Sequence, residues 1–248
     1  MASQCDPKGA ADACAIVELR RYSLHPGARE RLISLFEREF VETQEALGMR
    51  VIGQFRDLDV PDSFVWFRGF SDMEARKAAL TSFYGGPVWA AHRDEANGTM
   101  VNSDDVFLLR PAKGNAGFNL GGHLRPELND SPSVPGFFAM AIYHLRRAAG
   151  ECFLHIFARK LLPQLSTLGV TSIATLVTEA SANTFPRLPV REGEKVLVSL
   201  LRLGSGADFA EVRGRALAAT ADDAEITDQL VGEPDVSHLM ATARSLVR

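Results

Sequence analysis

The sequence predicts an α+β protein built from two tandem ferredoxin-like units, each with the order β-α-β-β-α-β, whose sheets pack against each other as one barrel. Three observations carry this prediction. The same order of elements occurs twice, a segment rich in Gly, Pro and Asn separates the two copies, and several strands are apolar on both faces. We therefore divide the chain into a domain at 14–110, a linker at 111–135 and a second, divergent domain at 136–248.

The first domain opens with a strand of alternating residues. Val17 and Leu19 fall on one face of it, and Glu18, Arg20 and Tyr22 fall on the other. The short turn between the next two apolar strands predicts an antiparallel hairpin. The expected elements are strands at 15–22, 50–56, 64–70 and 106–109, and helices at 28–47, from the capping box at 71–74 onward, and from Pro87 to about 97.

The second domain repeats this order with little residue identity. Pro163 should kink its first helix or tighten the end of that helix. Gly169 stops the same helix, as Gly48 stops its counterpart in the first domain. The expected elements are strands at 137–147, 171–178 and 195–203, helices at 151–168 and 205–220, and a last strand within 235–247.

Each such sheet carries helices on one face and leaves the other face bare. Trp66 alternates with Val65 and Phe67, and residues 196–201 are apolar on both faces. Strands of this kind are usually covered on both sides, because a large exposed apolar patch is unusual on a soluble protein. Packing the two bare faces together buries this surface, which predicts the closed barrel.

Composition and charge exclude several classes of function. A net charge of −4 offers no field for a phosphate backbone, so we expect no nucleic-acid partner. No run approaches the length of a membrane-spanning helix, and we expect no signal peptide, because residues 1–12 lack both a basic stretch and a long apolar run. Three scattered cysteines without CxxC spacing favour a reducing compartment, so we expect a cytoplasmic protein. Motifs for metal, nucleotide or hydrolase chemistry are absent, which predicts neither a metal site nor a cofactor.

The polar face of the first strand is the main candidate site. If Val17 and Leu19 pack on the helices, then Glu18, Arg20 and Tyr22 point into the barrel. Glu18 or Tyr22 could then act as a general acid or base, with Arg20 as a substrate-binding group. The alternative is a structural ion pair that ties the sheets together.

Other candidates lie around the predicted barrel mouth. Trp89, His92 and Arg93 have i, i+3, i+4 spacing and would share one helix face, where Trp and His suit a flat aromatic ligand. His92 is a catalytic candidate, although most such histidines are only surface residues. Tyr84 precedes Gly85-Gly86, which forms either a lid or a helix end.

Two further histidines are candidates of different kinds. His144 would take the position of Glu18 in the second copy and point inward as a catalytic residue, while Ala148 would take that of Tyr22. His25, beside Pro26-Gly27, could contact substrate or merely complete its turn.

The first copy resembles the NIPSNAP family. The residues that carry the resemblance are Glu18-Leu19-Arg20, Tyr22, Pro26-Gly27, Phe36, Gly48, Gly53, Phe55, Trp66, Arg76 and Trp89. It covers about 14–110 well and 136–248 only in outline. The resemblance implies the dimeric α/β-barrel superfamily, which includes cofactor-independent monooxygenases, haem-degrading oxygenases, isomerases and cyclases. Fold kinship alone is weak evidence of activity.

Three hypotheses of function follow. The first is a cofactor-independent enzyme of monooxygenase, isomerase or cyclase type that binds a small hydrophobic or aromatic molecule between the sheets, with Trp66 in its pocket; a barrel packed solid with side chains would rule this out. The second is a non-catalytic binding or adaptor protein with a filled barrel. The third is a haem-handling protein, which needs a histidine able to reach iron. A homodimer stays open, because fused duplicates can still pair through outer strand edges.

Overall fold

The computed structural model of the protein describes residues 14–113, 116–128, 130 and 135–248, so parts of the predicted linker lie outside it. The first half contains four strands, β1 (Ile16–Leu24), β2 (Arg50–Asp57), β3 (Ser63–Phe70) and β4 (Met100–Pro111). Its helices are α1 (Arg29–Leu35), the π-helical turn η1 (Phe36–Phe40), α2 (Val41–Ala46), α3 (Met73–Tyr84) and α4 (Pro87–Asn97).

The second half repeats the pattern. Its strands are β5 (Phe137–His144), β6 (Val170–Thr178), β7 (Val196–Leu203) and β8 (Asp235–Ala241). Its helices are α5 (Glu151–Ile156), the π-helical turn η3 (Phe157–Leu161), α6 (Leu162–Ser166), α7 (Phe209–Ala221) and the short α8 (Ala224–Thr227). A π-helical turn therefore interrupts the first helix of both halves at the same place, which is strong support for duplication.

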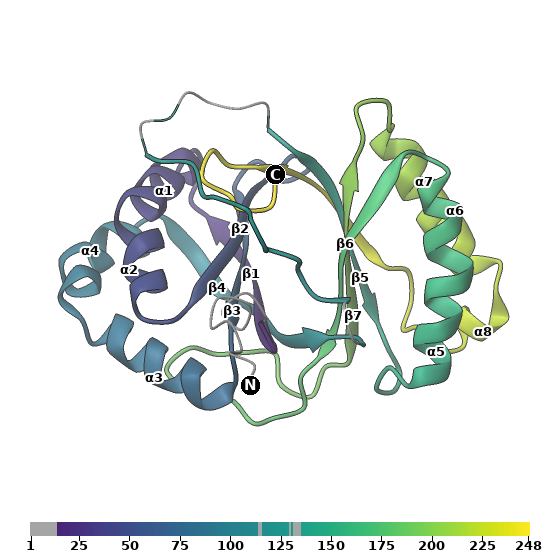
Figure 1. Ribbon diagram of the computed structural model, residues 1–248, viewed down its shortest axis with the longest axis horizontal. Helices are drawn as coiled ribbons and strands as arrows, with labels where there is room; N and C mark the ends of the chain where they lie inside the picture. Colours follow the sequence, from purple (N-terminus) through teal and green to yellow (C-terminus); the bar gives the residue numbers. More distant parts are fainter. Residues whose placement is uncertain (1–13, 114–115, 129, 131–134) are drawn as a thin grey trace, which may run out of the picture.

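The described strands form one closed barrel in the order β1-β3-β2-β8-β5-β7-β6-β4 (Figure 1). Each half contributes a ferredoxin-like sheet, β4-β1-β3-β2 or β6-β7-β5-β8, and all the pairings are antiparallel. The halves join through short ladders, at Phe55↔Ala241 between β2 and β8 and at Arg110↔Val177 between β4 and β6. The predicted fold is confirmed, and the closed barrel leaves none of these strands with a free edge for pairing with a second copy.

The interior of the barrel is filled with apolar side chains from both halves. Phe55 and Phe67 of the first half meet Phe138 of the second, and the Phe55 and Phe138 ring centroids lie 5.3 Å apart. The linker adds Phe118 and Leu120, and the C-terminal segment adds Leu246 and Val247. The expected ligand pocket between the sheets is therefore wrong, because close-packed side chains occupy that space. The form of the enzyme hypothesis that places the ligand between the sheets falls with it.

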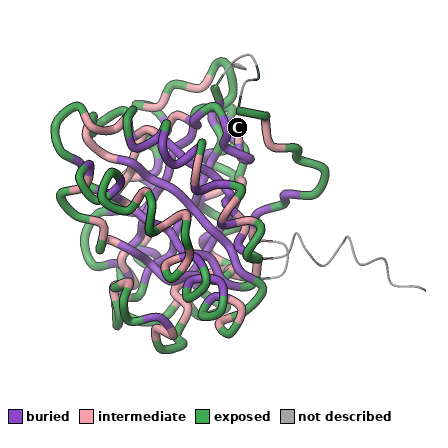
Figure 2. Tube along the Cα trace, turned by 90° about the vertical axis from the view of Figure 1, so that its left-hand side faces the viewer, coloured by how far each residue is buried: buried purple, intermediate pink, exposed green. Residues whose placement is uncertain are grey.

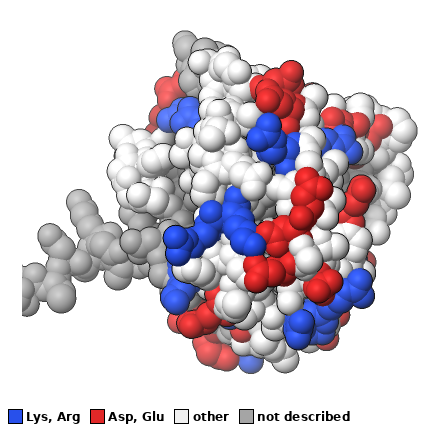
Figure 3. Space-filling view, turned by 90° about the vertical axis from the view of Figure 1, so that its right-hand side faces the viewer, with Lys and Arg blue, Asp and Glu red and all other residues white. Residues whose placement is uncertain are grey.

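The helices cover the outer faces of the barrel. The helices of the first half lie on one side of Figure 1 and those of the second half on the other. Figure 2 shows the buried segments running through the middle of the molecule, with exposed segments around them. On the outer face of the second half, acidic and basic groups lie beside one another (Figure 3), as in the pairs of Lys160 with Asp223 and Glu225. No helix in the described part of the chain is long and apolar enough to cross a membrane.

Some local expectations need correction. The cap of α3 is Asp72 rather than Ser71, because the Asp72 carboxylate accepts from the Ala75 amide at 2.7 Å. The strand expected at 106–109 extends over 100–111. β5 ends at His144 rather than at 147. Pro87 does occupy the first turn of α4 as expected.

Truncating Phe138 should destabilise the whole chain, because its ring is fully buried at the junction of the two halves. We expect Phe138→Ala to lower the free energy of unfolding by about 3–5 kcal/mol. The neighbouring Phe137 is 38% exposed, so Phe137→Ala is the matched control and should cost far less. Urea unfolding followed by far-UV circular dichroism measures both; equal losses would contradict the described barrel interior.

Candidate functional site

The polar residues of β1 face the helices and not the barrel. Val17 and Leu19 lie in the barrel core, whereas Tyr22 lies in the core between the first sheet and its helices. Glu18 and Arg20 share the Tyr22 face because side chains alternate along a strand. The expected orientation of β1 is therefore wrong: Val17 and Leu19 face the barrel, and Glu18, Arg20 and Tyr22 face the helices. The barrel interior buries Val17 and Leu19 because it is the larger apolar core.

On this helix side, Glu18 is held by three arginines, and we call these four residues the arginine cluster. The Glu18 carboxylate contacts Arg20 Nη1 at 2.8 Å, Arg68 Nη2 at 2.7 Å and Arg76 Nε at 2.7 Å. All four side chains are at most 1% exposed. Arg20 comes from β1, Arg68 from β3 and Arg76 from α3, so the cluster fastens a helix to two strands.

The electrostatic state of Glu18 follows from this arrangement. Burial alone would raise the pKa of its carboxyl, but the charges of Arg68, Arg20 and Arg76 outweigh burial and hold the pKa well below its usual range. The carboxylate stays ionised, and both of its oxygens already accept from guanidinium groups. This geometry favours a positioning role for Glu18, since so weak a base has little tendency to take a proton.

Tyr22 is hydrogen-bonded to the arginine cluster through Arg20. Arg20 Nε donates to the Tyr22 hydroxyl oxygen at 2.8 Å, which leaves the hydroxyl proton of Tyr22 free for another acceptor. Burial raises the pKa of Tyr22 despite the opposing charge of Arg20. Tyr22 is therefore a neutral hydrogen-bond donor at physiological pH, backed by a cation.

Tyr22 lines a small aromatic cavity between the first sheet and its helices, which we call the helix-side cavity. Its volume is about 30 Å³, enough for roughly one water molecule. Three predicted ligand-binding residues, Trp66, Tyr84 and Trp89, line it, and the ring centroids of Tyr84 and Trp89 lie 4.9 Å apart. The remaining lining residues are Leu32, Phe36, Phe40, Gln44, Phe83, Ala96 and Met100.

One polar atom at this cavity lacks a partner. Trp66 is 2% exposed, and its indole Nε1 has no hydrogen-bond partner in the described part of the chain. An unpaired buried N–H costs free energy, and such groups in native proteins call for a ligand, a water or a functional reason. Trp66 Nε1–H and the Tyr22 hydroxyl are thus two donors beside one aromatic cavity.

The second half supplies a cover for this site in the first half. The loop between β6 and β7 reaches α3, where Asn183 Oδ1 and Thr184 Oγ1 accept from Arg76 Nη1 at 3.0 and 3.2 Å. Phe185 is buried in the first-half core, with its ring stacked on Tyr84 at 5.9 Å between centroids. The loop therefore covers α3 and the Tyr84 ring from outside, whereas all the residues that line the cavity belong to the first half.

The other candidates of α4 and the first turn lie outside the cavity lining. His92 is half-buried at the rim, 3.5 Å from Glu39 and with its ring centroid 6.4 Å from that of Phe40. Arg93 is exposed and pairs with Asp94. His25 is exposed, and its backbone completes the turn by accepting from the Ala28 amide.

His144 lies at the barrel mouth rather than at a counterpart of Glu18. Its ring nitrogens are 3.5 Å from Glu194 and 3.5 Å from Asp235. Because β5 places residues 139, 141 and 143 on its helix side, the counterpart of Tyr22 is Tyr143, not Ala148. Counting back along both strands, Ala139 and Ala141 stand where Glu18 and Arg20 stand, so the second half lacks the arginine cluster.

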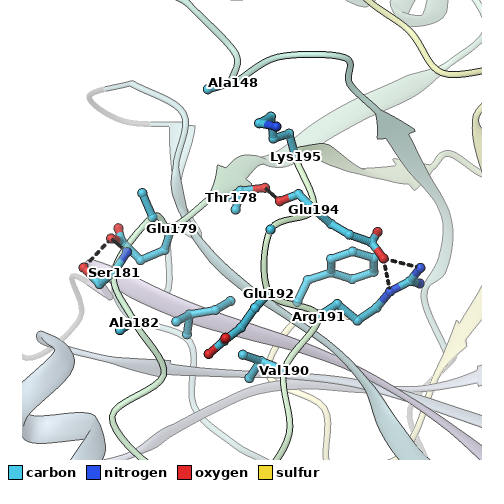
Figure 4. A pocket seen from close by; sticks show the side chains of 14 residues that line it. Ala148, Thr178, Glu179, Ser181, Ala182, Val190, Arg191, Glu192, Glu194 and Lys195 are labelled. Carbon is cyan, nitrogen blue, oxygen red and sulfur yellow. Dashed lines mark hydrogen bonds and ion pairs between the residues drawn. The ribbon is translucent and has the colours of Figure 1, made fainter.

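A larger hollow lies near this mouth, between the β6–β7 loop and β4. It holds about 410 Å³ and is lined by Phe107, Ala148 and residues 178–182 and 190–195, among others. Its polar side chains largely satisfy one another, as Ser181 does with Glu179 and Arg191 with Glu194 (Figure 4). We therefore place the candidate site in the smaller helix-side cavity, where donors remain unpaired. No group of three or more His, Cys, Asp or Glu residues could hold a metal ion within the described ranges.

Several site residues escaped sequence reasoning. Arg68 shares a strand face with Trp66, two residues away, which could have signalled a buried guanidinium opposite Glu18. Gln44 was missed because it lies on a helix with an ordinary amphipathic pattern. Its Oε1 atom accepts from Arg68 Nη1 at 3.1 Å. The covering loop at 183–188 gives no local signal at all, because its partner α3 lies about a hundred residues away.

Residues 17–114 match the NIPSNAP family model, so this part of the chain is a NIPSNAP domain. It spans every first-half element that lines the helix-side cavity. An uncharacterized NIPSNAP domain protein from Burkholderia xenovorans is 19% identical over 39% of this chain and 94% of its own, with a TM-score of 0.37. No curated protein matches the chain.

Other solved structures resemble nearly the whole chain. A candidate monooxygenase from Lactobacillus acidophilus NCFM is 14% identical, with 92% of this chain and 96% of that one covered and a TM-score of 0.52. An anthrone oxidase-like protein is 12% identical over 96% of each chain, with a TM-score of 0.54. At these identities, both likenesses establish a shared barrel fold.

Replacing Glu18 by Gln should destabilise the chain in a pH-dependent way. At neutral pH we expect Glu18→Gln to cost about 3–5 kcal/mol, because it leaves buried guanidinium groups without their carboxylate. The ordinary carboxyl pKa is near 4.5 and the folded pKa is far lower, so the stabilisation by Glu18 is complete above pH 4.5 and declines as pH falls below it. The gap between wild type and variant should therefore narrow in acid.

Urea unfolding at a series of pH values between 7 and 3 measures this gap. The control is Glu151→Gln, because the Glu151 side chain is 86% exposed in a surface pair with Lys113. The control should differ little from wild type throughout. A Glu18→Gln gap that stays constant down to pH 3 would contradict the ionised cluster.

Proposed function

We propose that the chain is a cofactor-independent enzyme that binds a small aromatic molecule in the helix-side cavity of its NIPSNAP domain and oxidises it with O₂. One observation carries the proposal: the Tyr22 hydroxyl and the unpartnered Trp66 Nε1–H flank an aromatic cavity that is backed by buried guanidinium groups. The shared fold with a candidate monooxygenase and an anthrone oxidase-like protein supports the class of reaction.

The proposed chemistry uses the two donors on a ligand oxygen. They stabilise the negative charge that appears on a ketone or phenol oxygen when the substrate loses a proton to water. The resulting carbanion is oxidised directly by O₂, and a CH₂ group becomes a C=O group as O₂ supplies that oxygen and leaves its second atom as water. Carbon loses four electrons and O₂ gains four, so the reaction balances without another co-reactant.

Binding a ring requires the cavity to widen. The cover formed by Phe185 over Tyr84 is the part that we propose moves, because it is held to the first half by one stacked pair and by the hydrogen bonds of Asn183 and Thr184. Neither His92 nor His144 lines the cavity, which gives the haem-handling alternative no support there.

A non-catalytic binding protein is the second candidate. The filled barrel favours it, as does a cavity that holds only about one water in this state. Both candidates place a ligand beside Tyr22 and Trp66. They differ in whether O₂ is consumed.

Removing one donor should abolish most of the activity. With anthrone as the test substrate, we expect O₂ uptake and quinone absorbance, and we expect Tyr22→Phe and Trp66→Phe each to lower kcat/KM by roughly a hundredfold. Tyr143→Phe is the matched control, because Tyr143 is buried at the corresponding place of the second half without an arginine partner. It should leave kcat/KM unchanged.

Ligand binding distinguishes the two candidates. Binding of anthrone that depends on Tyr22 and Trp66, without O₂ uptake, would decide for a binding protein. Turnover that Tyr22→Phe and Trp66→Phe leave intact would place the active site elsewhere.

A further inference from the structure

The arginine cluster carries more positive than negative charge. Arg20, Arg68 and Arg76 are each at most 1% exposed, and Glu18 is the only carboxylate that pairs with any of them in the described part of the chain. The cluster therefore has a formal charge of +2 in the protein interior. Uncompensated buried charge is costly, so this excess needs either a neutralising environment or an anion.

The aromatic rings offset only part of this excess. The guanidinium carbons of Arg68 and Arg20 lie 5.1 and 5.7 Å from the Trp66 ring centroid, and that of Arg20 lies 5.4 Å from the Tyr22 centroid. Each such contact contributes about 0.5–2 kcal/mol, less than a full counter-charge. The Arg76 Nη2 atom, moreover, has no hydrogen-bond partner among the described residues.

The excess charge adjoins the helix-side cavity. Trp66 and Tyr22, the rings nearest to the two guanidinium groups, both line it. Gln44 lines it as well, and its Oε1 atom accepts from Arg68 Nη1. A negative charge placed there lies one side chain away from Arg20 and from Arg68, in a medium that screens charge far less than water does.

We infer that the helix-side cavity selects an anionic aromatic ligand, a phenolate, an enolate or an aromatic carboxylate, whose charge is the missing counter-ion of the arginine cluster. This inference rests on the proposed function and adds its substrate class: an ionisable aromatic molecule is bound as its anion. Neutral aromatic molecules of the same size bind less tightly.

The test uses one pair of probes and two opposite changes of charge. The probes are 4-nitrophenol, whose anion has its own visible absorption, and its neutral methyl ether, 4-nitroanisole. Spectrophotometric pH titration with the full-length protein should show the pKa of bound 4-nitrophenol lowered by about one unit, which is a tenfold preference for the anion.

Gln44→Glu supplies the missing carboxylate beside Arg68. The new carboxylate gains the charge of Arg68 but loses the hydrogen bond that Gln44 Nε2 donates to the Phe40 carbonyl oxygen, so Gln44→Glu should lower the melting temperature of the ligand-free protein less than a carboxylate buried elsewhere does. It should weaken binding of the anionic probe by about tenfold and change binding of 4-nitroanisole far less. Glu18→Gln makes the opposite change, and its folded fraction should bind the anion more tightly than wild type does.

The matched control is Gln54→Glu. Gln54 is fully buried and pairs across the strands with Trp66, and neither its Oε1 nor its Nε2 atom has a hydrogen-bond partner in the described part of the chain. Gln54→Glu should therefore lower the melting temperature, because it buries a carboxylate without a guanidinium partner.

The outcomes separate this inference from the proposed function. Binding of both probes with equal affinity and an unshifted 4-nitrophenol pKa would overturn the anion selectivity while leaving an aromatic ligand site in place. A Gln44→Glu variant that is destabilised as much as Gln54→Glu would likewise overturn the charge excess. Failure of both probes to bind would overturn the site itself.

Discussion

Barrel closure is the constraint on which the rest of this structure depends. Two ferredoxin-like sheets share one interior, and apolar side chains such as Leu19, Phe55 and Phe138 fill it. Since successive side chains of a strand point to opposite faces, the neighbours of each residue that faces the barrel face the helices. Glu18, Arg20 and Tyr22 of β1 therefore lie beneath the helices, and the candidate site lies there with them.

The order of elements and the closed barrel could be predicted because both follow from patterns within each copy. The orientation of β1 could not be predicted, because Val17 and Leu19 could pack equally well in the barrel or under the helices. Which of these two apolar cores buries them depends on the whole fold. A one-residue error in phase also misplaced His144 as the counterpart of Glu18, although β5 sends residues 139, 141 and 143 to the helix side.

The candidate site shows the same limit of sequence reasoning. From their residue types, Tyr22 could be identified as a catalytic candidate and Trp66, Tyr84 and Trp89 as ligand-binding candidates, and the four line one cavity. The partners that give these residues their electrostatic character are distant in sequence. Arg68 comes from another strand and Arg76 from a helix, and no periodicity links either of them to Glu18.

Because the two copies are joined in one chain, their corresponding residues can differ, which is impossible in a homodimer. In a dimer of identical subunits, symmetry would give each subunit the same site and the same cover. Here Glu18 and Arg20 have lost their counterparts to Ala139 and Ala141, while the second copy contributes the loop that carries Phe185. The function that we propose therefore implies one ligand per 248-residue chain, bound by the first half, with a loop of the second half packed beside the site.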